Sequence, residues 1–253
     1  MKKFFLIFWI LGLVAFGMVS CERDDDNGGT GNGNTPSTPT NPTDTTSTPT
    51  DTTATPVPDG YVDLGLPSGL LWASCNLGAT TREGYGNYYA WGETSTKGTY
   101  DWSTYAYGSG YYQLTKYCNN SIYGLNGFTD NLTTLEAADD AATVVLGNGA
   151  RIPTKAEWQE LIDNTTGVRT TVNGVIGRMF TAANGSSLFL PAAGYWGGSS
   201  LYNDDTDGYY WSSSLCESGP DYAWYMYFGS GGKYVTYYER RYGLSVRAVR
   251  SRN

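Results

Sequence analysis

The chain has 253 residues, a formal net charge of −8 and no histidine, which excludes catalysis or metal binding through imidazole. The acidic balance argues against nucleic acid as a partner, because that binding needs clustered Lys and Arg to neutralise phosphates. Composition separates an apolar start (residues 1–20), a Thr/Pro-rich segment without aromatics (residues 21–59) and residues 60–253, which hold all 22 tyrosines and enough chain for one sizeable core.

The first residues have the pattern of a secretion signal. Lys2 and Lys3 precede an apolar run that is short for a membrane span. Ser20 before Cys21 resembles a bacterial lipobox, which implies cleavage before Cys21 and lipidation of that cysteine. Two or three acyl chains, at about 0.8 kcal/mol per buried methylene, would anchor the protein stably to a membrane. The alternatives are an ordinary signal with a chance cysteine and an uncleaved anchor.

The acidic run Glu22–Asp26 follows the expected lipidated cysteine directly. It resembles the surface-export signal of Bacteroidetes lipoproteins, which implies an outer-membrane lipoprotein exposed at the cell surface. A solvated charge run is the alternative explanation.

Residues 21–59 are expected to form a disordered tether. Thr, Pro, Asn, Gly and Asp dominate them, so they cannot bury enough apolar area to offset the entropy of ordering. Two Asp-Thr-Thr triplets resemble the O-glycosylation site of Bacteroidetes, which implies glycans on Thr45 and Thr52. Chance triplets in a Thr-rich linker are the alternative.

Two capping boxes predict helices in the middle of residues 60–253. The first box is Thr133–Glu136, followed by apolar residues at helical spacing that end at Gly147. The second box is Thr154–Glu157, and it places Trp158 and Leu161 on one helix face. We expect about three turns in each helix.

The remaining pattern predicts short, mostly antiparallel strands, so the fold class is α+β. Asn173-Gly174 predicts a hairpin, because both residues accept the positive φ of a type I′ turn. The segment Tyr195–Tyr210 is rich in Gly and Ser and is expected to be a loop. The expected strands are Tyr61–Leu66, Leu70–Cys75, Asn87–Trp91, Ser187–Leu190, Tyr209–Ser213, Ala223–Phe228, Lys233–Tyr238 and Leu244–Val249.

Several spaced motifs carry a family resemblance. Arg151–Trp158 reads Arg-Ile-Pro-Thr-Lys-Ala-Glu-Trp and resembles a signature of the C-type-lectin-like and formylglycine-generating-enzyme-like superfamily. Together with Leu190–Tyr195, Tyr210–Ser214, Ala223–Tyr225 and Gly243–Arg247, it resembles the Fibrobacter succinogenes major paralogous domain and its relatives in Bacteroides surface lipoproteins. The resemblance implies a C-type-lectin-like fold, in which the first and last strands pair, two helices flank the sheets and long loops carry ligand sites.

The known chemistries of this superfamily do not carry over to the chain. Formylglycine-generating enzymes hold copper at two cysteines near the end of the chain, where only Cys216 is present. The Glu-Pro-Asn, Gln-Pro-Asp and Trp-Asn-Asp motifs of calcium-dependent lectins are absent from the sequence. Asp139 and Asp140 should point to different helix faces, and Glu93 has no evident partner, so no acid pair for glycoside hydrolysis is indicated. We expect a protein that is not an enzyme.

Calcium is the one cofactor that the sequence suggests. Asn203, Asp205 and Asp207, followed by Gly208, match the start of a calcium loop with oxygen ligands at positions one, three and five. The twelfth position is Ser214, where a bidentate Glu belongs. An acidic surface turn is the alternative.

Lipidation of Cys21 would leave an odd number of cysteines, so at most one intramolecular disulfide can form. Cys216 lies in a polar segment, and the expected pair is therefore Cys75 with Cys118. In the chain-entropy model, closing this loop would contribute roughly 4 kcal/mol.

Aromatic side chains are the strongest remaining functional signal. Flat sugar faces stack on exposed rings, and rings also dominate protein hot spots. We expect Tyr195, Trp196 and Tyr202 to contact a ligand, with Asn203 and Asp205 supplying hydrogen bonds. The sequence thus predicts a surface lipoprotein that binds a glycan or a protein partner. A structural or adhesin component of the envelope or fimbriae is the alternative, and an enzyme of unknown activity ranks third.

Overall fold

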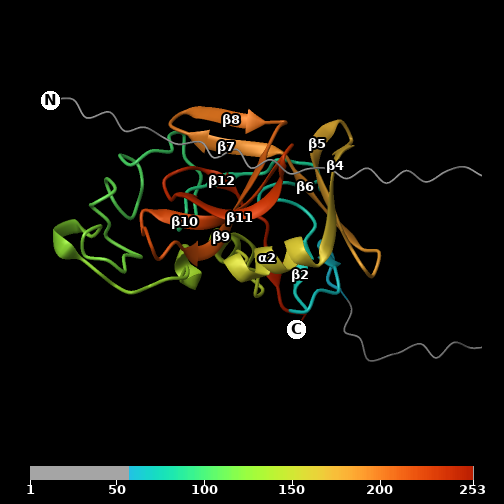
Figure 1. The fold of residues 1–253 in the computed structure, drawn as a ribbon, viewed down its shortest axis with the longest axis horizontal. Helices are drawn as coiled ribbons and strands as arrows, with labels where there is room; N and C mark the ends of the chain where they lie inside the picture. Colours follow the sequence, from blue (N-terminus) through green and yellow to red (C-terminus); the bar gives the residue numbers. More distant parts are fainter. Residues whose placement is uncertain (1–56, 253) are drawn as a thin grey trace, which may run out of the picture. The chain divides into compact units, whose positions relative to one another are not determined.

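The two ends of the folded part lie in one small sheet (Figure 1). The computed structural model describes residues 57–252, so the expected signal at 1–20, Cys21, most of the 21–59 tether, Thr45 and Thr52 lie outside the described residues. Strand β2 (Leu71–Ala73) lies between β1 (Tyr61–Asp63) and β13 (Val249–Arg250) and pairs antiparallel with both. The first and last strands therefore share a sheet without pairing directly.

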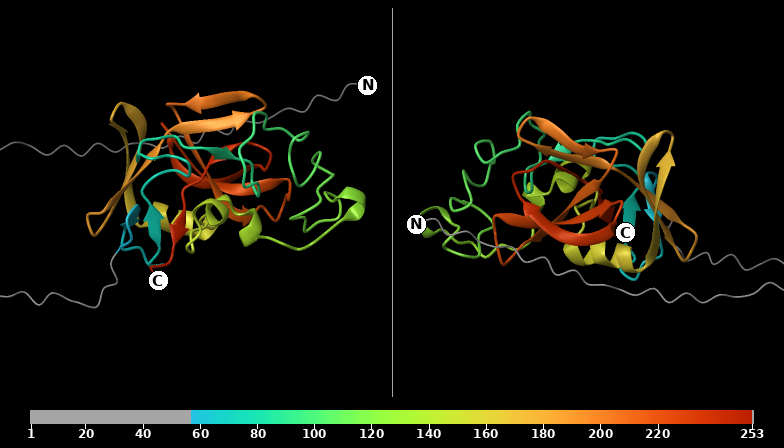
Figure 2. Two further views of the ribbon diagram at one scale, coloured as in Figure 1. Left: turned by 180° about the vertical axis from the view of Figure 1, so that it is seen from behind. Right: turned by 45° about the horizontal axis from the view of Figure 1, so that its top comes forward.

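The largest sheet has seven strands. Its main path is β11 (Gly232–Glu239), β10 (Tyr222–Gly229), β9 (Gly208–Leu215), β12 (Leu244–Ser245) and β3 (Tyr88–Tyr89). Two further strands, β7 (Ala193–Gly197) and β8 (Ser200–Asp204), form a hairpin joined to β9 through β7. The hairpin and helix α2 (Lys155–Asp163) lie on opposite sides of β9–β11 (Figures 1 and 2).

A third sheet is an antiparallel meander of β4 (Thr165–Val172), β5 (Val175–Ala182) and β6 (Ser187–Pro191). Asn173 and Gly174 join β4 to β5 with φ values of 48° and 84°, which confirms the predicted hairpin. With its few short helices and three sheets, the described part is α+β, as the sequence predicts. No helix within residues 57–252 is long and apolar enough to span a bilayer.

The Gly- and Ser-rich segment after Ala193 is a hairpin, and the prediction of a loop there was wrong. Tyr195 pairs with Tyr202, and Trp196 pairs with Leu201. Gly194 adopts a φ of 62°, and a Cβ at this position would collide with the backbone of the facing strand β8. Glycine is used here for close backbone approach and not for loop freedom.

Helix α2 begins as predicted, at the capping box formed by Thr154 and Glu157, and it buries Trp158 and Leu161. It has nine residues, which is about two and a half turns. The first expected helix is shorter still. The Thr133–Glu136 box does not start it, because Thr134 instead forms a β-bridge with Ser214 of β9.

The 3-10 turns η1 (Leu125–Gly127) and η2 (Ala137–Asp139) precede helix α1 (Ala141–Leu146). The side chain of Asp140 caps α1 by accepting from Thr143 N at 2.9 Å, and Gly147 ends the helix as predicted. Of the expected apolar face, Ala142 is buried in the core, whereas Val145 and Leu146 are exposed, so the C-terminal half of this helix does not contribute to the core.

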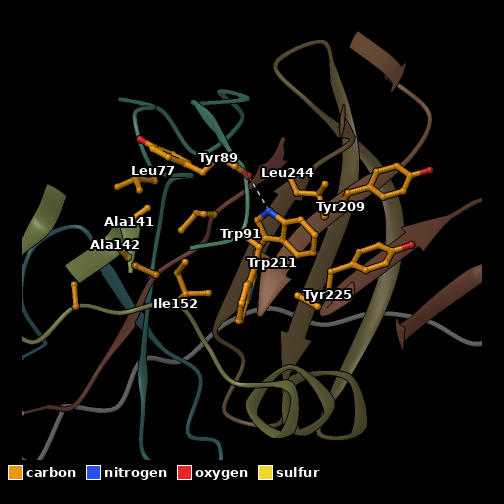
Figure 3. Packing of buried hydrophobic residues seen from close by; sticks show 14 of the residues in the cluster. Leu77, Tyr89, Trp91, Ala141, Ala142, Ile152, Tyr209, Trp211, Tyr225 and Leu244 are labelled. Carbon is orange, nitrogen blue, oxygen red and sulfur yellow. Dashed lines mark hydrogen bonds between the residues drawn. The ribbon is translucent and has the colours of Figure 1, made fainter. Parts of the chain in front are cut away.

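Tryptophan indoles join β9 to neighbouring elements of the hydrophobic core, and Figure 3 marks the bond between Trp211 and Tyr89. Trp91 Nε1 donates to Ser212 O at 2.8 Å, and Trp211 Nε1 donates to Tyr89 O at 2.8 Å. On the other face, Trp158 Nε1 donates to Trp211 O at 3.0 Å, and its ring lies 4.8 Å from that of Trp72. Two clusters of buried residues thus meet at β9.

Two buried arginines bind backbone carbonyls. The Arg247 guanidinium donates to Ala73 O, Ser74 O and Phe189 O and to the Asn76 side chain, at 2.7–3.1 Å. Burial lowers the pKa of Arg247 to about 10, so it remains charged at neutral pH. Arg240 donates to the carbonyl of Tyr117, and so fastens the long irregular segment between β3 and η2.

Asp139 is the second anchor of this long segment, which extends to one side of the sheets (Figure 2). Its carboxylate accepts hydrogen bonds from Tyr107 Oη at 2.7 Å, Tyr117 Oη at 2.6 Å and Lys116 Nζ at 2.6 Å. Burial raises the pKa of Asp139, but these three donors outweigh burial and hold the pKa below its usual value. The carboxylate is therefore held in its charged form.

Replacing this carboxylate should weaken the fold and change its response to acid. A depressed carboxyl pKa stabilises the fold above the unfolded pKa of about 4, and the stabilisation is lost as pH falls through the folded value. We expect Asp139→Asn to lower the free energy of unfolding by about 2 kcal/mol at neutral pH. The loss should shrink as the pH falls below about 4, as measured by urea unfolding.

The exposed Asp59 provides a matched control, and Asp59→Asn should leave the free energy of unfolding at neutral pH unchanged. An Asp139→Asn variant with wild-type stability throughout the pH range would contradict the anchoring role of Asp139.

Candidate binding site

Eight tyrosines with neighbouring rings gather on the side of the large sheet that faces the β7–β8 hairpin. We call them the tyrosine face: Tyr195, Tyr202, Tyr209, Tyr225, Tyr227, Tyr234, Tyr238 and Tyr242. The shortest separation between ring centroids is 4.5 Å, between Tyr238 and Tyr242. Such separations are typical of favourable aromatic pairs.

Strand alternation and register create this face. Tyr225 and Tyr227 lie two residues apart on β10 and so project to the same side. Tyr227 is paired with Tyr209 of β9 and with Tyr234 of β11. A row of rings therefore crosses three strands, as expected for directly opposed side chains in a sheet.

Tyr195 of β7 joins the hairpin to this row. Its ring centroid lies 4.9 Å from that of Tyr209, 5.4 Å from that of Tyr238 and 5.5 Å from those of Tyr202 and Tyr242. A half-buried ring with four aromatic neighbours has little freedom to reorient. The ring of Tyr202 stacks on the ring of Tyr195 and is therefore supported by a fixed neighbour.

The face has a buried floor and an exposed rim. Tyr209 and Tyr225 are only 8% and 7% exposed, whereas Tyr202 and Tyr234 are 47% and 52% exposed. The rim rings are thus open to solvent but packed on immobile neighbours. This is the arrangement that an aromatic binding surface requires.

Polar groups border the rings. Asn203 Nδ2 donates to the Tyr209 hydroxyl at 2.8 Å. Arg241 Nη2 donates to the Tyr242 hydroxyl at 2.8 Å, and its guanidinium carbon lies 4.2 Å from the centre of that ring. Arg241 is also paired with Glu239 at 2.5 Å. Groups of both charge signs therefore lie beside the aromatic surface and can orient a polar ligand.

The expected ligand residues divide between two surfaces. Tyr195 and Tyr202 stack at 5.5 Å on the tyrosine face, and Asn203 lies next to them. Trp196 follows Tyr195 in β7 and therefore projects to the opposite side. It is half-buried, and its ring lies 6.4 Å from the ring of Tyr100. The structure does not bring Trp196 together with Tyr202.

Trp196 instead borders a separate pocket of about 250 Å³. The pocket is lined by Gly86, Asn87, Tyr88, Thr96, Lys97, Tyr100 and Trp196. Trp196 thus acts mainly as a wall packed against Tyr88 and Tyr100.

The acidic turn after β8 makes several hydrogen bonds within the protein. Asn203 bonds to Tyr209, and Asp205 accepts a hydrogen bond from the Tyr85 hydroxyl. Arg169 Nη1 donates to Thr206 O at 2.6 Å, so a guanidinium lies beside this turn. Within residues 57–252 no three or more His, Cys, Asp and Glu side chains gather into a metal-binding group. Calcium binding at Asn203, Asp205 and Asp207 stays a prediction.

The expected disulfide between Cys75 and Cys118 is not formed, and Cys75, Cys118 and Cys216 are all free. Cys118 is buried and its thiol donates to Asn120 O at 3.1 Å, within its own turn. Cys75 is half-exposed and lines a pocket together with Asp59 and Leu146. Folding of the long segment directs the two side chains into different surroundings, which sequence spacing could not show.

Sequence reasoning missed six members of the tyrosine face. They are Tyr209, Tyr225, Tyr227, Tyr234, Tyr238 and Tyr242. A usable signal was present, because Tyr225 and Tyr227 have strand spacing and a turn centred on Ser230-Gly231 opposes Tyr227 to Tyr234. The register of β9 and the position of β7 could not be predicted from local sequence patterns.

Comparison with known proteins gives one partial match. Residues 179–249 match a family described as a domain of unknown function (DUF8237). The matched region runs from within β5 to the start of β13 and includes every strand of the tyrosine face. No curated protein and no solved structure matches the chain significantly.

The buried phenols should make the fold sensitive to alkali. Burial raises the pKa of Tyr209, Tyr225 and Tyr238. A phenol with a raised folded pKa stabilises the fold below the unfolded pKa of about 10, and this stabilisation is lost as pH rises above that value. We expect the free energy of unfolding to fall steeply above about pH 10. Phenolate absorbance from these rings should appear only as tertiary structure is lost.

Tyr225→Phe removes a hydroxyl that ionises in the unfolded state while keeping the ring, so it should make the alkaline loss of stability shallower. Reversible ionisation of all tyrosines in a folded protein would contradict this interpretation.

Proposed function

We propose that this chain is a surface-anchored, non-enzymatic lipoprotein that binds glycans through the tyrosine face. The observation that carries the proposal is that the exposed rings of Tyr202 and Tyr234 pack on the rings of Tyr195 and Tyr227. The rings of Tyr195 and Tyr227 both contact the buried ring of Tyr209. Pyranose rings offer flat apolar faces that stack on such side chains, while their hydroxyls need polar partners. Asn203 and Arg241 supply polar groups beside the rings.

A C-type-lectin-like fold, of the kind found in the Fibrobacter succinogenes major paralogous domain, is the architecture that we propose. Three features support it: the first and last strands of the described part share one sheet, helices lie beside the sheets, and a long irregular segment connects β3 to η2. The motif residues have structural uses consistent with this assignment. Arg151 forms an ion pair with Glu157 at 2.5 Å, and Trp158 and Arg247 are fully buried.

The structural roles of the acidic residues support a binding protein over an enzyme. Glu93 pairs with Lys97 at 2.8 Å and accepts from the backbone of Ala106. Asp139 anchors the long segment, and Asp140 caps α1. Each carboxylate is thus engaged in holding the fold, as expected for a scaffold that presents a surface.

A protein partner, as in an adhesin or fimbrial component, is the second candidate. It is favoured by the apolar side chains that the long segment exposes, of which Tyr112 and Ile122 are 63% and 69% exposed. Exposed apolar groups of this kind are found at protein interfaces.

Tyr202→Ala tests the glycan proposal most directly. Loss of an exposed stacking ring should weaken binding by about 2 kcal/mol, or roughly thirtyfold, with little loss of stability. Binding would be measured first on a glycan array and then by titration calorimetry with the best glycan.

The matched control is Tyr112→Ala, which removes an exposed ring from the long segment and should leave glycan affinity unchanged. No glycan bound by the wild type, together with capture of a protein through Tyr112, would favour the second candidate instead.

Attachment to the outer membrane through Cys21 is the second part of the proposal. In the native host, labelled fatty acid should enter the wild type and be absent from Cys21→Ala, because the lipidated thiol is removed. Exogenous protease should release the folded part from intact wild-type cells if it is displayed outside. Equal labelling of both proteins would contradict lipidation at Cys21.

A further inference from the structure

Strand β11 is an open edge of the largest sheet. It pairs with β10 at eight consecutive positions and with no other strand of the described part. One residue beyond β11, Arg240 N donates to Asp221 O on the strand β10 side. In an antiparallel ladder every second residue bonds to the neighbouring strand, so Arg240 and the even-numbered residues of β11 bond towards β10. The backbone N–H and C=O groups of Lys233, Val235 and Tyr237 therefore point away from β10, towards the open side.

This edge lacks most of the features that prevent strand addition. Proteins protect edges with proline, bulges, short strands or charged side chains, and the one lysine of β11, Lys233, is bonded to Ile162 O of its own chain. β11 has eight residues, Gly-Lys-Tyr-Val-Thr-Tyr-Tyr-Glu, with no proline and no break in register against β10. Tyr234 and Tyr237 are 52% and 49% exposed, and no residue of the strand is fully buried. An extended strand can therefore add to it by backbone hydrogen bonds.

We propose that the added strand is β11 of a second copy of this chain, running antiparallel about a two-fold axis at Thr236. In this register the outward backbone groups of Val235 meet those of the partner's Tyr237, and the reverse pairing completes the ladder. The same register places Lys233 opposite the partner's Glu239, so the strand is complementary in charge to itself.

Both charges already have partners within their own chain. Lys233 Nζ donates to Ile162 O at 3.1 Å, and Glu239 is paired with Arg241 at 2.5 Å. The opposed charges therefore favour this register by attraction across the strands rather than by a new bridging contact. A shift of register by two residues would lose this opposition.

Pairing in this register extends the tyrosine face. Tyr234 and Tyr238 project to that face. In the dimer, Tyr234 would lie opposite the partner's Tyr238, and Tyr238 would lie opposite the partner's Tyr234. These are non-hydrogen-bonded positions, where Cα atoms are about 4.5 Å apart and aromatic pairs are favourable. The two tyrosine faces become one surface with two-fold symmetry, which would raise the avidity for a repeating glycan. The dimer itself does not depend on glycan binding.

Cross-linking at the axis tests the proposal in the full chain on intact cells. Thr236→Cys places two thiols opposite each other in the proposed register, at a separation that a disulfide spans. We expect a shift from the monomer to a band of twice its mass on a non-reducing gel. The parent chain with its native cysteines, and Ser199→Cys at an exposed hairpin position, should stay monomeric.

A second substitution separates strand pairing from chance collision. In the Thr236→Cys background, Tyr237→Pro removes an outward N–H and no bond to β10, so it should abolish the dimer band. Tyr237→Ala removes the same ring but keeps the N–H, and it should retain the band. Cross-linking no greater than that of Ser199→Cys, survival of the band in Tyr237→Pro, or a band at the mass of another protein would each overturn the proposal.

Discussion

The position of β9 depends on indole N–H groups that reach its backbone from both hydrophobic clusters. Trp91 donates to Ser212 O from one cluster, and Trp158 donates to Trp211 O from the other. β9 meets β12 at a single bridge, and its register against β10 shifts between Trp211 and Leu215, so strand pairing is incomplete around these carbonyls. A buried carbonyl left without a donor would cost about 1–3 kcal/mol. The tryptophans thus set where β9 lies, and β9 sets the register of everything paired to it.

The tyrosine face is a consequence of that register. Once β9 is fixed, Tyr209 lies opposite Tyr227, and Tyr227 lies opposite Tyr234 on β11. The hairpin then adds Tyr195, whose ring closes the row from the other side. Burial is graded along this row, from fixed rings at the floor to solvent-exposed rings at the rim. A surface of this kind is rigid because its lower half belongs to the core.

Buried charged side chains also hold the backbone in place through hydrogen bonds. Arg247 and Arg240 are buried against main-chain carbonyls, and Asp139 collects three donors from the long segment. These contacts hold irregular chain in one conformation without a disulfide between Cys75 and Cys118. The proposed dimer likewise depends on backbone groups, namely those that the sheet leaves without a hydrogen-bonded strand at β11.

Local features of the sequence were sufficient to predict the α+β class, the α2 capping box at Thr154 and the Asn173-Gly174 turn. Each depends on a few neighbouring residues, whose conformational preferences act before any tertiary contact. The sequence also pointed to Tyr195 and Tyr202, although not to the rings around them. Tertiary structure alone decided the rest: Thr134 joined β9 instead of starting a helix, and Trp196 turned away from Tyr202. The reason is that strand pairing joins residues distant in sequence, so register and facing depend on packing that no local pattern records.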